Sequence, residues 1–85
     1  IEDDVVAQCR QTFTNIEAAL TQAGSSLQDV VRVTYLLPEP TDFEKCWPVL
    51  RERFGDVRPA ATMLSARLVE PCIKIEIEVT ARKRR

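Results

Sequence analysis

The residues of this chain that could do chemistry lie in its second half, on two stretches that alternate between polar and apolar side chains. One predicted face collects Ala61, Met63, Ser65 and Arg67 from the first stretch and Lys74, Glu76, Glu78 and Thr80 from the second. A face that mixes small, thioether, hydroxyl and carboxylate groups is neither a core nor a fully hydrated surface. It fits a subunit interface that contains a cleft, with a carboxylate such as Glu76 facing a small ligand.

Metal chemistry is not expected, and neither is a cofactor. The chain has three cysteines and no histidine. The cysteines Cys9, Cys46 and Cys72 include no Cys-x-x-Cys pair, so no zinc-binding spacing is present. Cys9 and Cys46 fall within apolar helical patterns and are predicted to be buried free thiols, which favours a cytoplasmic, reducing location.

A first helix is expected from about Asp3 to Ala23, because apolar residues recur there at the 3, 4, 3, 4 spacing of one helix face and Gly24 follows as a stop. The apolar positions are Val6, Cys9, Phe13, Ile16 and Leu20.

A second helix is expected to open at Thr41 and to stop at Gly55, since Thr41 and Glu44 have the spacing of a capping box. Pro48 lies inside this segment and predicts either a kink or a regular helix that begins only near Trp47. The expected apolar face comprises Phe43, Trp47, Leu50 and Phe54.

Three strands are expected, at Val31–Leu37, Ala60–Leu68 and Ile73–Arg82, with a turn around Glu70-Pro71 between the last two. The first strand is long enough for the interior of a sheet. With the helices, the order predicts an α+β sandwich in which both helices cover one face of a small sheet. The sets expected to meet the helices are Ile73, Ile75, Ile77 and Val79, and Ala60, Thr62, Leu64, Ala66 and Leu68.

Size and charge limit what the chain can do alone. Its 85 residues make one domain, and a domain this small buries only about 60% of its unfolded surface, so oligomerisation is the expected source of further stability. The net charge of −1 gives no electrostatic footprint for nucleic acid, and no apolar run is long enough to span a membrane. The basic tail Arg82-Lys83-Arg84-Arg85 reads as a solvated chain end; a nuclear address or a phosphate-binding tag are the alternatives.

Four segments together resemble the Rid (YjgF) family, over about Glu2 to Lys83. They are Asp29-Val30-Val31-Arg32-Val33-Thr34, Thr41-Asp42-Phe43, Arg58-Pro59-Ala60 and Ile75-Glu76-Ile77-Glu78. The resemblance implies a chorismate-mutase-like fold, a homotrimer, and small-molecule clefts between neighbouring subunits. Family members carry further N-terminal strands, so the chain is expected to be a fragment, or to receive those strands from elsewhere.

The resemblance also implies a reaction, the hydrolysis of enamines and imines to keto acids and ammonia. In the family an arginine holds the substrate carboxylate, and a glutamate, matched here by Glu76, helps to order the attacking water. Ala61 stands at the arginine position, Met63 where cysteine is common, and Trp47 where asparagine is common. A charged hydrogen bond contributes about 1.5–3 kcal/mol, so these departures favour an uncharged or apolar ligand.

Structural alternatives remain for the residues singled out. Glu76 could simply pair with Lys74 or with a neighbouring strand, and Trp47 could belong to the apolar face of its helix. Arg67 lies about 20 Å from Ala61 along the strand, too far to replace the missing arginine. Arg58 and Arg32 remain open as replacements from a neighbouring subunit.

Three functions from different classes therefore remain. The first is an imine or enamine deaminase with altered specificity, with Glu76 as the catalytic residue and Ala61, Met63, Ser65, Trp47 and Arg58 around the ligand. The second is a ligand-binding or regulatory trimer without catalysis. The third, a ribonuclease or translation inhibitor, is the weakest, because the chain has no histidine and no basic groove.

Overall fold

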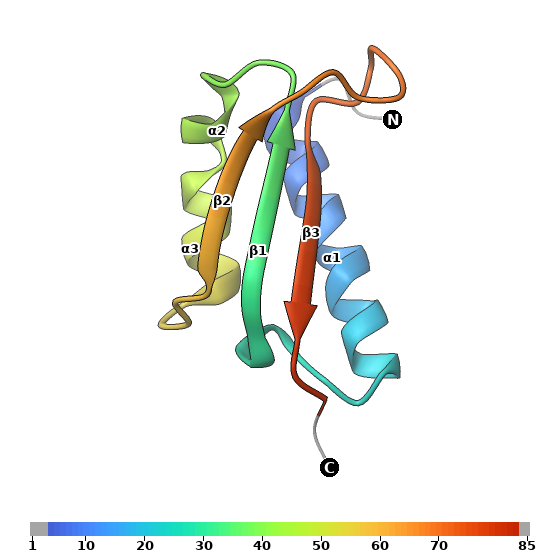
Figure 1. The fold of residues 1–85 in the computed structure, drawn as a ribbon, viewed down its shortest axis with the longest axis vertical. Helices are drawn as coiled ribbons and strands as arrows, with labels where there is room; N and C mark the ends of the chain where they lie inside the picture. The colour runs from blue at the N-terminus through green and yellow to red at the C-terminus, as the bar shows by residue number, and fades with distance from the viewer. Residues whose placement is uncertain (1–3, 84–85) are drawn as a thin grey trace.

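A computed structural model describes residues 4–83, which form two layers, a three-stranded sheet with helices against one of its faces (Figure 1). In chain order the elements are α1 (Val5–Gln22), the 3-10 turn η1 (Leu27–Asp29), β1 (Val30–Leu37), α2 (Asp42–Lys45), α3 (Trp47–Phe54), β2 (Ala60–Ser65) and β3 (Glu76–Ala81). The strand order is β2-β1-β3, with β1 parallel to β2 and antiparallel to β3. The predicted α+β class, with helices on one face of a mixed sheet, is confirmed.

Helix α1 follows its sequence pattern closely. The Asp4 carboxylate caps the helix by accepting a hydrogen bond from the Val6 amide at 3.1 Å. Cys9 and Phe13, one turn apart on the apolar face, are fully buried. The helix ends before Gly24, whose positive φ of 79° allows the chain to reverse toward the sheet.

The second helical segment is broken in two at Cys46, which separates α2 from α3. This is the predicted alternative in which regular helix begins near Trp47, because Pro48 fits the first turn of a helix, where its missing amide costs nothing. The predicted capping box is wrong. Thr41 makes no side-chain cap bond, and its hydroxyl donates instead to the Glu39 carboxylate at 3.0 Å.

The break also changes which side chains of this segment reach the core. Trp47 was expected on the apolar face but is 48% exposed, whereas Cys46 and Val49 are almost completely buried. Phe54 is buried as expected, and its ring meets that of Phe13 edge-on with centroids 5.4 Å apart.

Strand β1 is central, as its length suggested, and Val33, Tyr35 and Leu37 point into the core. The alternation fails at the start of the strand. The pairing with β3 shifts register between Val30 and Arg32, so that Val30 is buried and Val31, expected inside, is 42% exposed.

The outer strands are shorter than expected, since β2 ends at Ser65 and β3 begins at Glu76. The predicted apolar face of β3 is confirmed, because Ile75 and Ile77 are buried.

The predicted face of β2 is wrong. Side chains of directly paired residues point to the same face of a sheet, and Ala61, Met63 and Ser65 pair with the buried Val33, Tyr35 and Leu37. The set expected to meet the helices, including Thr62 and Leu64, therefore lies on the opposite face.

The core fills the space between the sheet and the helices. Its buried members are Val5, Cys9, Phe13, Leu27, Val30, Val33, Tyr35, Leu37, Cys46, Val49, Phe54, Ile75 and Ile77. Cys9, Cys46 and Cys72 are free thiols, the first two buried as predicted and the third exposed. No helix within residues 4–83 has the length and apolar character that a membrane span requires.

Candidate functional site

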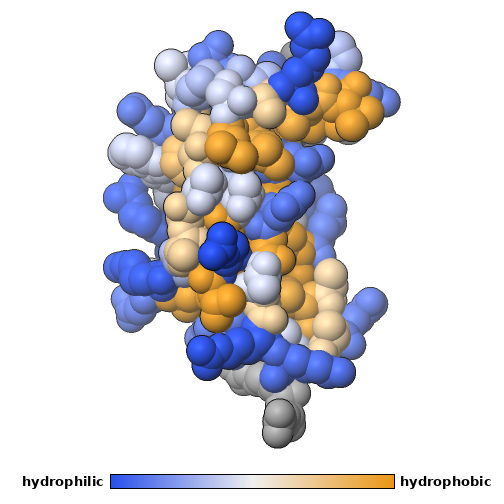
Figure 2. Space-filling view, in the orientation of Figure 1, coloured by the Kyte–Doolittle hydropathy of each residue, from blue (hydrophilic) through white to orange (hydrophobic). Residues whose placement is uncertain are grey.

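The sheet face that points away from the helices, hereafter the open face, carries the predicted catalytic carboxylate. It is formed by Arg32, Thr34 and Leu36 on β1, Ala60, Thr62 and Leu64 on β2, and Glu76, Glu78 and Thr80 on β3. Figure 2 shows this side of the molecule, where apolar surface is interrupted by polar side chains. Leu64 remains 49% exposed there. A small domain with leucine and charged residues mixed on one uncovered sheet face presents a surface suited to a partner.

Glu76 opens β3 and pairs with Leu36. Its side chain is exposed, on the predicted face. The ion pairs among residues 4–83 are Lys45–Asp42 and Arg53–Glu17, and Glu76 belongs to neither of them. The carboxylate is therefore available to accept a hydrogen bond from a water or a ligand.

Ala61, Met63 and Ser65 do not share the face of Glu76. They lie on the helix face of β2, yet all three are exposed, because β2 is an edge strand that the helices cover incompletely. The Ser65 hydroxyl donates a long hydrogen bond of 3.4 Å to the Pro38 carbonyl. Together the three residues make a shallow, mostly apolar strip along the edge of the sheet.

The two parts of the predicted cleft are separated within one chain. Ala61 pairs with Val33, and Glu76 pairs with Leu36, on opposite sides of β1 and on opposite faces of the sheet. Two strand spacings put them roughly 9.5 Å apart across the sheet, and the offset along β1 adds about 10 Å. Ala61 and Glu76 are therefore well separated within one chain.

Trp47 occupies the first position of α3 and keeps 48% of its surface exposed. The alternative in which it belongs to the core is therefore wrong. An exposed indole that begins a helix offers a stacking surface and one N–H donor to a ligand or a partner.

The arginines near the strands have different surroundings. Arg58, immediately before β2, donates from Nη1 to the carbonyl oxygens of Gly55 at 2.8 Å and Val57 at 3.3 Å, and so closes the turn that ends α3. Arg32 lies on the open face, in register with Ala60 and Thr80. Arg58 is thus occupied by the backbone, and Arg32 faces the same side as Glu76.

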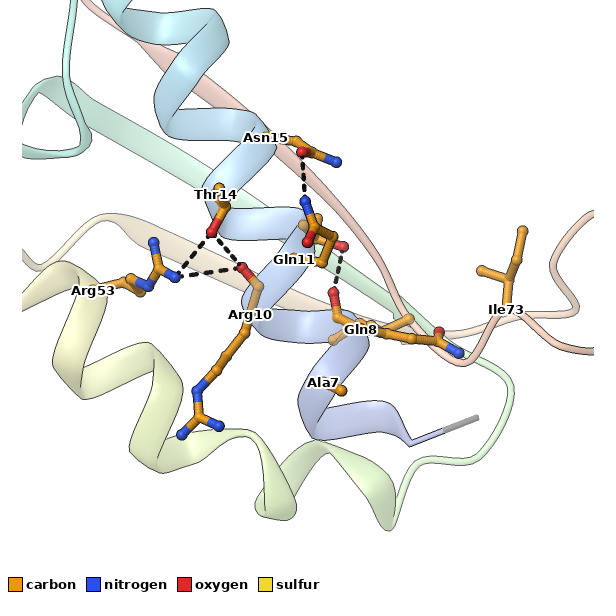
Figure 3. Close-up of a pocket in the computed structure, with 10 residues that line it drawn as sticks. Ala7, Gln8, Arg10, Gln11, Thr14, Asn15, Arg53 and Ile73 are labelled. Atoms are coloured by element: carbon orange, nitrogen blue, oxygen red, sulfur yellow. Dashed lines mark hydrogen bonds between the residues drawn. The ribbon is translucent and has the colours of Figure 1, made fainter. Parts of the chain in front are cut away.

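A further depression lies along the outer side of α1 (Figure 3). Its polar groups are mostly engaged with one another. Gln11 donates to Asn15 at 2.9 Å, and Arg53 donates to the Thr14 hydroxyl at 3.1 Å and the Arg10 carbonyl at 3.4 Å. The two Arg53 contacts tie α3 to α1, and we assign the depression a structural role. Sequence reasoning did not find it, because most of its residues lie on α1, outside the apolar face of an ordinary amphipathic helix.

The described residues contain no group of three or more histidine, cysteine, aspartate or glutamate side chains placed to hold a metal ion. The side chains that the site presents are a carboxylate, a hydroxyl, an indole, the Arg32 guanidinium and apolar groups.

Comparison with known proteins identifies relatives of this chain. The family model for Endoribonuclease L-PSP matches residues 1–83. A RutC family protein from Pyrococcus horikoshii is 39% identical over 83 residues, covering 98% of this chain and 66% of the relative. The 3-aminoacrylate deaminase RutC of Acinetobacter baylyi is 35% identical over 78 residues, covering 92% of this chain and 62% of the relative. The chain thus spans somewhat less than two thirds of the length of these relatives.

Among solved structures, a member of the YjgF/YER057c/UK114 family from Mycobacterium tuberculosis superimposes with a TM-score of 0.90 at 35% identity. The match covers 95% of this chain and 70% of the other.

Proposed function

This chain belongs to the Endoribonuclease L-PSP (Rid, YjgF) family, and from that premise we propose that it is an imine or enamine deaminase of altered specificity, acting at a cleft between subunits of a homotrimer. A relative named 3-aminoacrylate deaminase supports the reaction class. The free thiols Cys9, Cys46 and Cys72 fit a cytoplasmic location.

The observation that carries this proposal is the exposed Glu76 carboxylate on the open face, which takes part in neither ion pair seen among residues 4–83. A carboxylate in that state can accept a proton or a hydrogen bond from water and aim it at an electrophilic carbon. Attack of the water on the imine carbon, followed by loss of ammonia, gives the carbonyl product. Glu76 orders the water in this scheme, and no metal is needed for it.

The separation of Ala61 and Glu76 within one chain supports a cleft shared between copies of the chain. Since these residues lie on opposite faces and opposite sides of β1, a cleft lined by both would join two copies of the chain. The open face, with Leu36 and Leu64, supplies apolar surface for such a contact. Each interface would then join the Glu76 face of one copy to the Ala61 strip of the next.

The substrate class that we propose depends on the side chain of Ala61. An arginine at that position would clamp a carboxylate, whereas Ala61, Met63 and Trp47 offer methyl, thioether and indole groups. We therefore assign to the cleft an imine without a carboxylate, with Met63 and Trp47 packing against its apolar part.

The direct test is hydrolysis of freshly generated imines by the longest available form of the protein. We expect ammonia release from carboxylate-free imines to be faster than from matched imines that carry a carboxylate. If the protein accelerates the hydrolysis of no imine, the proposal that it is a deaminase is wrong.

A second candidate is a ligand-binding trimer without turnover, which the same apolar strip favours. A thermal-shift screen distinguishes this binder from the enzyme. A metabolite that raises Tm and is recovered chemically unchanged identifies a binder. The ribonuclease suggested by the family description lacks support in the sequence, which has no histidine. A ribonuclease activity of this protein would have to elute together with the protein from a size-exclusion column.

A further inference from the structure

The side-chain amide of Gln8 joins α1 to the segment that leads into β3. Its Nε2 donates to the Cys72 carbonyl at 2.8 Å, and its Oε1 accepts from the Lys74 amide at 2.7 Å. Since a carbonyl needs a donor and an N–H needs an acceptor, both ends of the side-chain amide are matched to their partners. One residue of a neighbouring parallel strand would bond the same two backbone groups, so Gln8 takes the place of a strand here.

Residues 72–74 lie beyond the ladder that β3 forms with β1. That ladder ends at the pair Leu36 and Glu76. The next carbonyl of β1, that of Leu37, accepts from the Ala66 amide at 3.0 Å. The side-chain amide on α1 therefore bonds the backbone at the point where β1 stops doing so, two positions before β3 begins.

Gln8 is itself held in place by α1. Its backbone amide donates to the Asp4 carbonyl at 2.9 Å, and its neighbour Cys9 is fully buried in the core. Figure 3 shows the Gln8 side chain reaching from the helix toward the segment around Ile73. A side chain that starts on a packed helix and ends on two backbone groups fixes that segment relative to the helix.

Glu76 is the functional group that follows directly after this contact. Ile75 and Ile77, on either side of it, are buried and set how deeply the strand lies against the core. The direction in which the chain enters the strand depends on residues 72–74, which the side-chain amide holds. Direction matters for catalysis, because a misplacement of about 1 Å can cost about 100-fold in rate.

We propose that Gln8 is a positioning residue, which holds the start of β3 so that the Glu76 carboxylate is aimed at the attacking water. Its part in catalysis rests on the proposed function, whereas its hold on the strand does not. Gln8 acts through Glu76 in this scheme and does not touch the substrate. Its loss should therefore lower kcat and leave KM nearly unchanged.

The hold on the strand is tested with Gln8→Met, which keeps the length of the side chain and removes its strong donor and acceptor. Gln11→Met, on the same helix, is the matched control, because Gln11 donates within α1 to Asn15. In Gln8→Met we expect the Lys74 amide to exchange its hydrogen at least about 10-fold faster, and the amide resonance of Glu76 to shift, both measured by NMR. In Gln11→Met both should match the wild type.

The part in catalysis is tested by a double-mutant cycle with Glu76→Gln. Gln8→Met alone should lower kcat for imine hydrolysis by roughly 10- to 100-fold, with little change of KM. In the Glu76→Gln background it should lower kcat by less than about 2-fold, because that variant has no carboxylate left to position. A general loss of folding would instead lower kcat equally in both backgrounds.

The outcomes separate this proposal from the deaminase itself. An unchanged Lys74 exchange rate in Gln8→Met would overturn the proposal, whether or not the protein hydrolyses imines. Equal losses of kcat in the two backgrounds, or a loss confined to KM, would overturn the part of Gln8 in catalysis. A wild type that hydrolyses no imine would reject the deaminase, and the exchange of Lys74 would still decide whether Gln8 holds the strand.

Discussion

The Glu76 carboxylate is the group on which the proposed reaction depends. Replacing it by Gln keeps its size and removes its charge and basicity, so we expect kcat for imine hydrolysis to fall by about 10²- to 10⁴-fold. The circular dichroism spectrum should stay the same, because the side chain is exposed.

Glu78 provides the matched control for this change. It lies on the same open face, paired with Thr34 instead of Leu36. Glu78→Gln should retain most of the activity. Equal losses in the two variants would show that the rate responds to the charge of the face and not to Glu76.

Tyr35 gives a prediction about alkaline pH. Burial raises the pKa of Tyr35 from 10.0 to about 12. Between these two pH values Tyr35 keeps its proton in the folded protein but has lost it in the unfolded chain. The contribution of Tyr35 to the free energy of unfolding is therefore constant below about pH 10 and decreases as the pH rises toward 12. The free energy of unfolding, measured by urea titration at a series of pH values, should decrease in this window.

Tyr35 is the only tyrosine, so absorbance of the phenolate follows the same group directly. A Tyr35→Phe variant should lose the part of the alkaline slope that belongs to this residue. A phenolate that titrates at pH 10 in the folded protein would contradict the burial of the hydroxyl.

At the scale of elements, the contact between α1 and α3 depends on Phe13, which is fully buried and meets Phe54 edge-on. Phe13→Ala should lower the free energy of unfolding by about 3–5 kcal/mol, through lost burial and the cavity left behind. Asn15→Ala on the exposed side of the same helix should change it by less than about 0.5 kcal/mol. A loss below about 1 kcal/mol for Phe13→Ala in a denaturant titration would contradict this packing.

The elements that the sequence predicts well are those with strong contrast between their two sides. Helix α1 and the segment of strand β3 each have a continuous apolar set that faces the core, for example Ile75 directly before β3 and Ile77 within it. The break at Cys46 was one of two predicted outcomes for Pro48. In these places the local pattern and the tertiary packing agree.

Strand β2 could not be oriented from its sequence. Its residues are Ala, Ala, Thr, Met, Leu and Ser, so neither face is clearly more apolar, and as an edge strand it is exposed on both sides. Its orientation follows only from pairing with β1, which local alternation does not encode. The register shift at Val30 and Arg32 likewise reversed the expected burial of Val31.

This orientation matters for the candidate site. Glu76 lies on the face that alternation predicted, but Ala61, Met63 and Ser65 lie on the other. The sequence predicted a site on one face, whereas the structure places its two parts on different faces. The pairing of β2 with β1 is thus the observation that supports the proposed cleft between subunits.

For the whole molecule, the proposed trimer makes a prediction about the open face. Leu64, on this face and 49% exposed, should be covered by a neighbouring copy. Leu64→Asp would place a charge in an apolar contact, and we expect the mass measured by light scattering to fall from that of three chains to that of one. Gln22→Asp, at the exposed end of α1, is the control and should leave the mass unchanged. A wild-type protein with the mass of one chain would contradict the shared cleft.

The most direct test of the central claim, a family cleft whose specificity changed at Ala61, is the kinetics of an Ala61→Arg variant. Matched imines with and without a carboxylate would be compared, with Ala60→Arg, one residue away on the open face, as the control. The new arginine should add a charged hydrogen bond to the substrate carboxylate, which contributes about 1.5–3 kcal/mol. We therefore expect the ratio of kcat/KM for the imine with a carboxylate to kcat/KM for the imine without one to rise roughly 10- to 100-fold in Ala61→Arg and to stay unchanged in Ala60→Arg. An unchanged ratio, or an equal change in both variants, would contradict the assignment of Ala61 to the cleft.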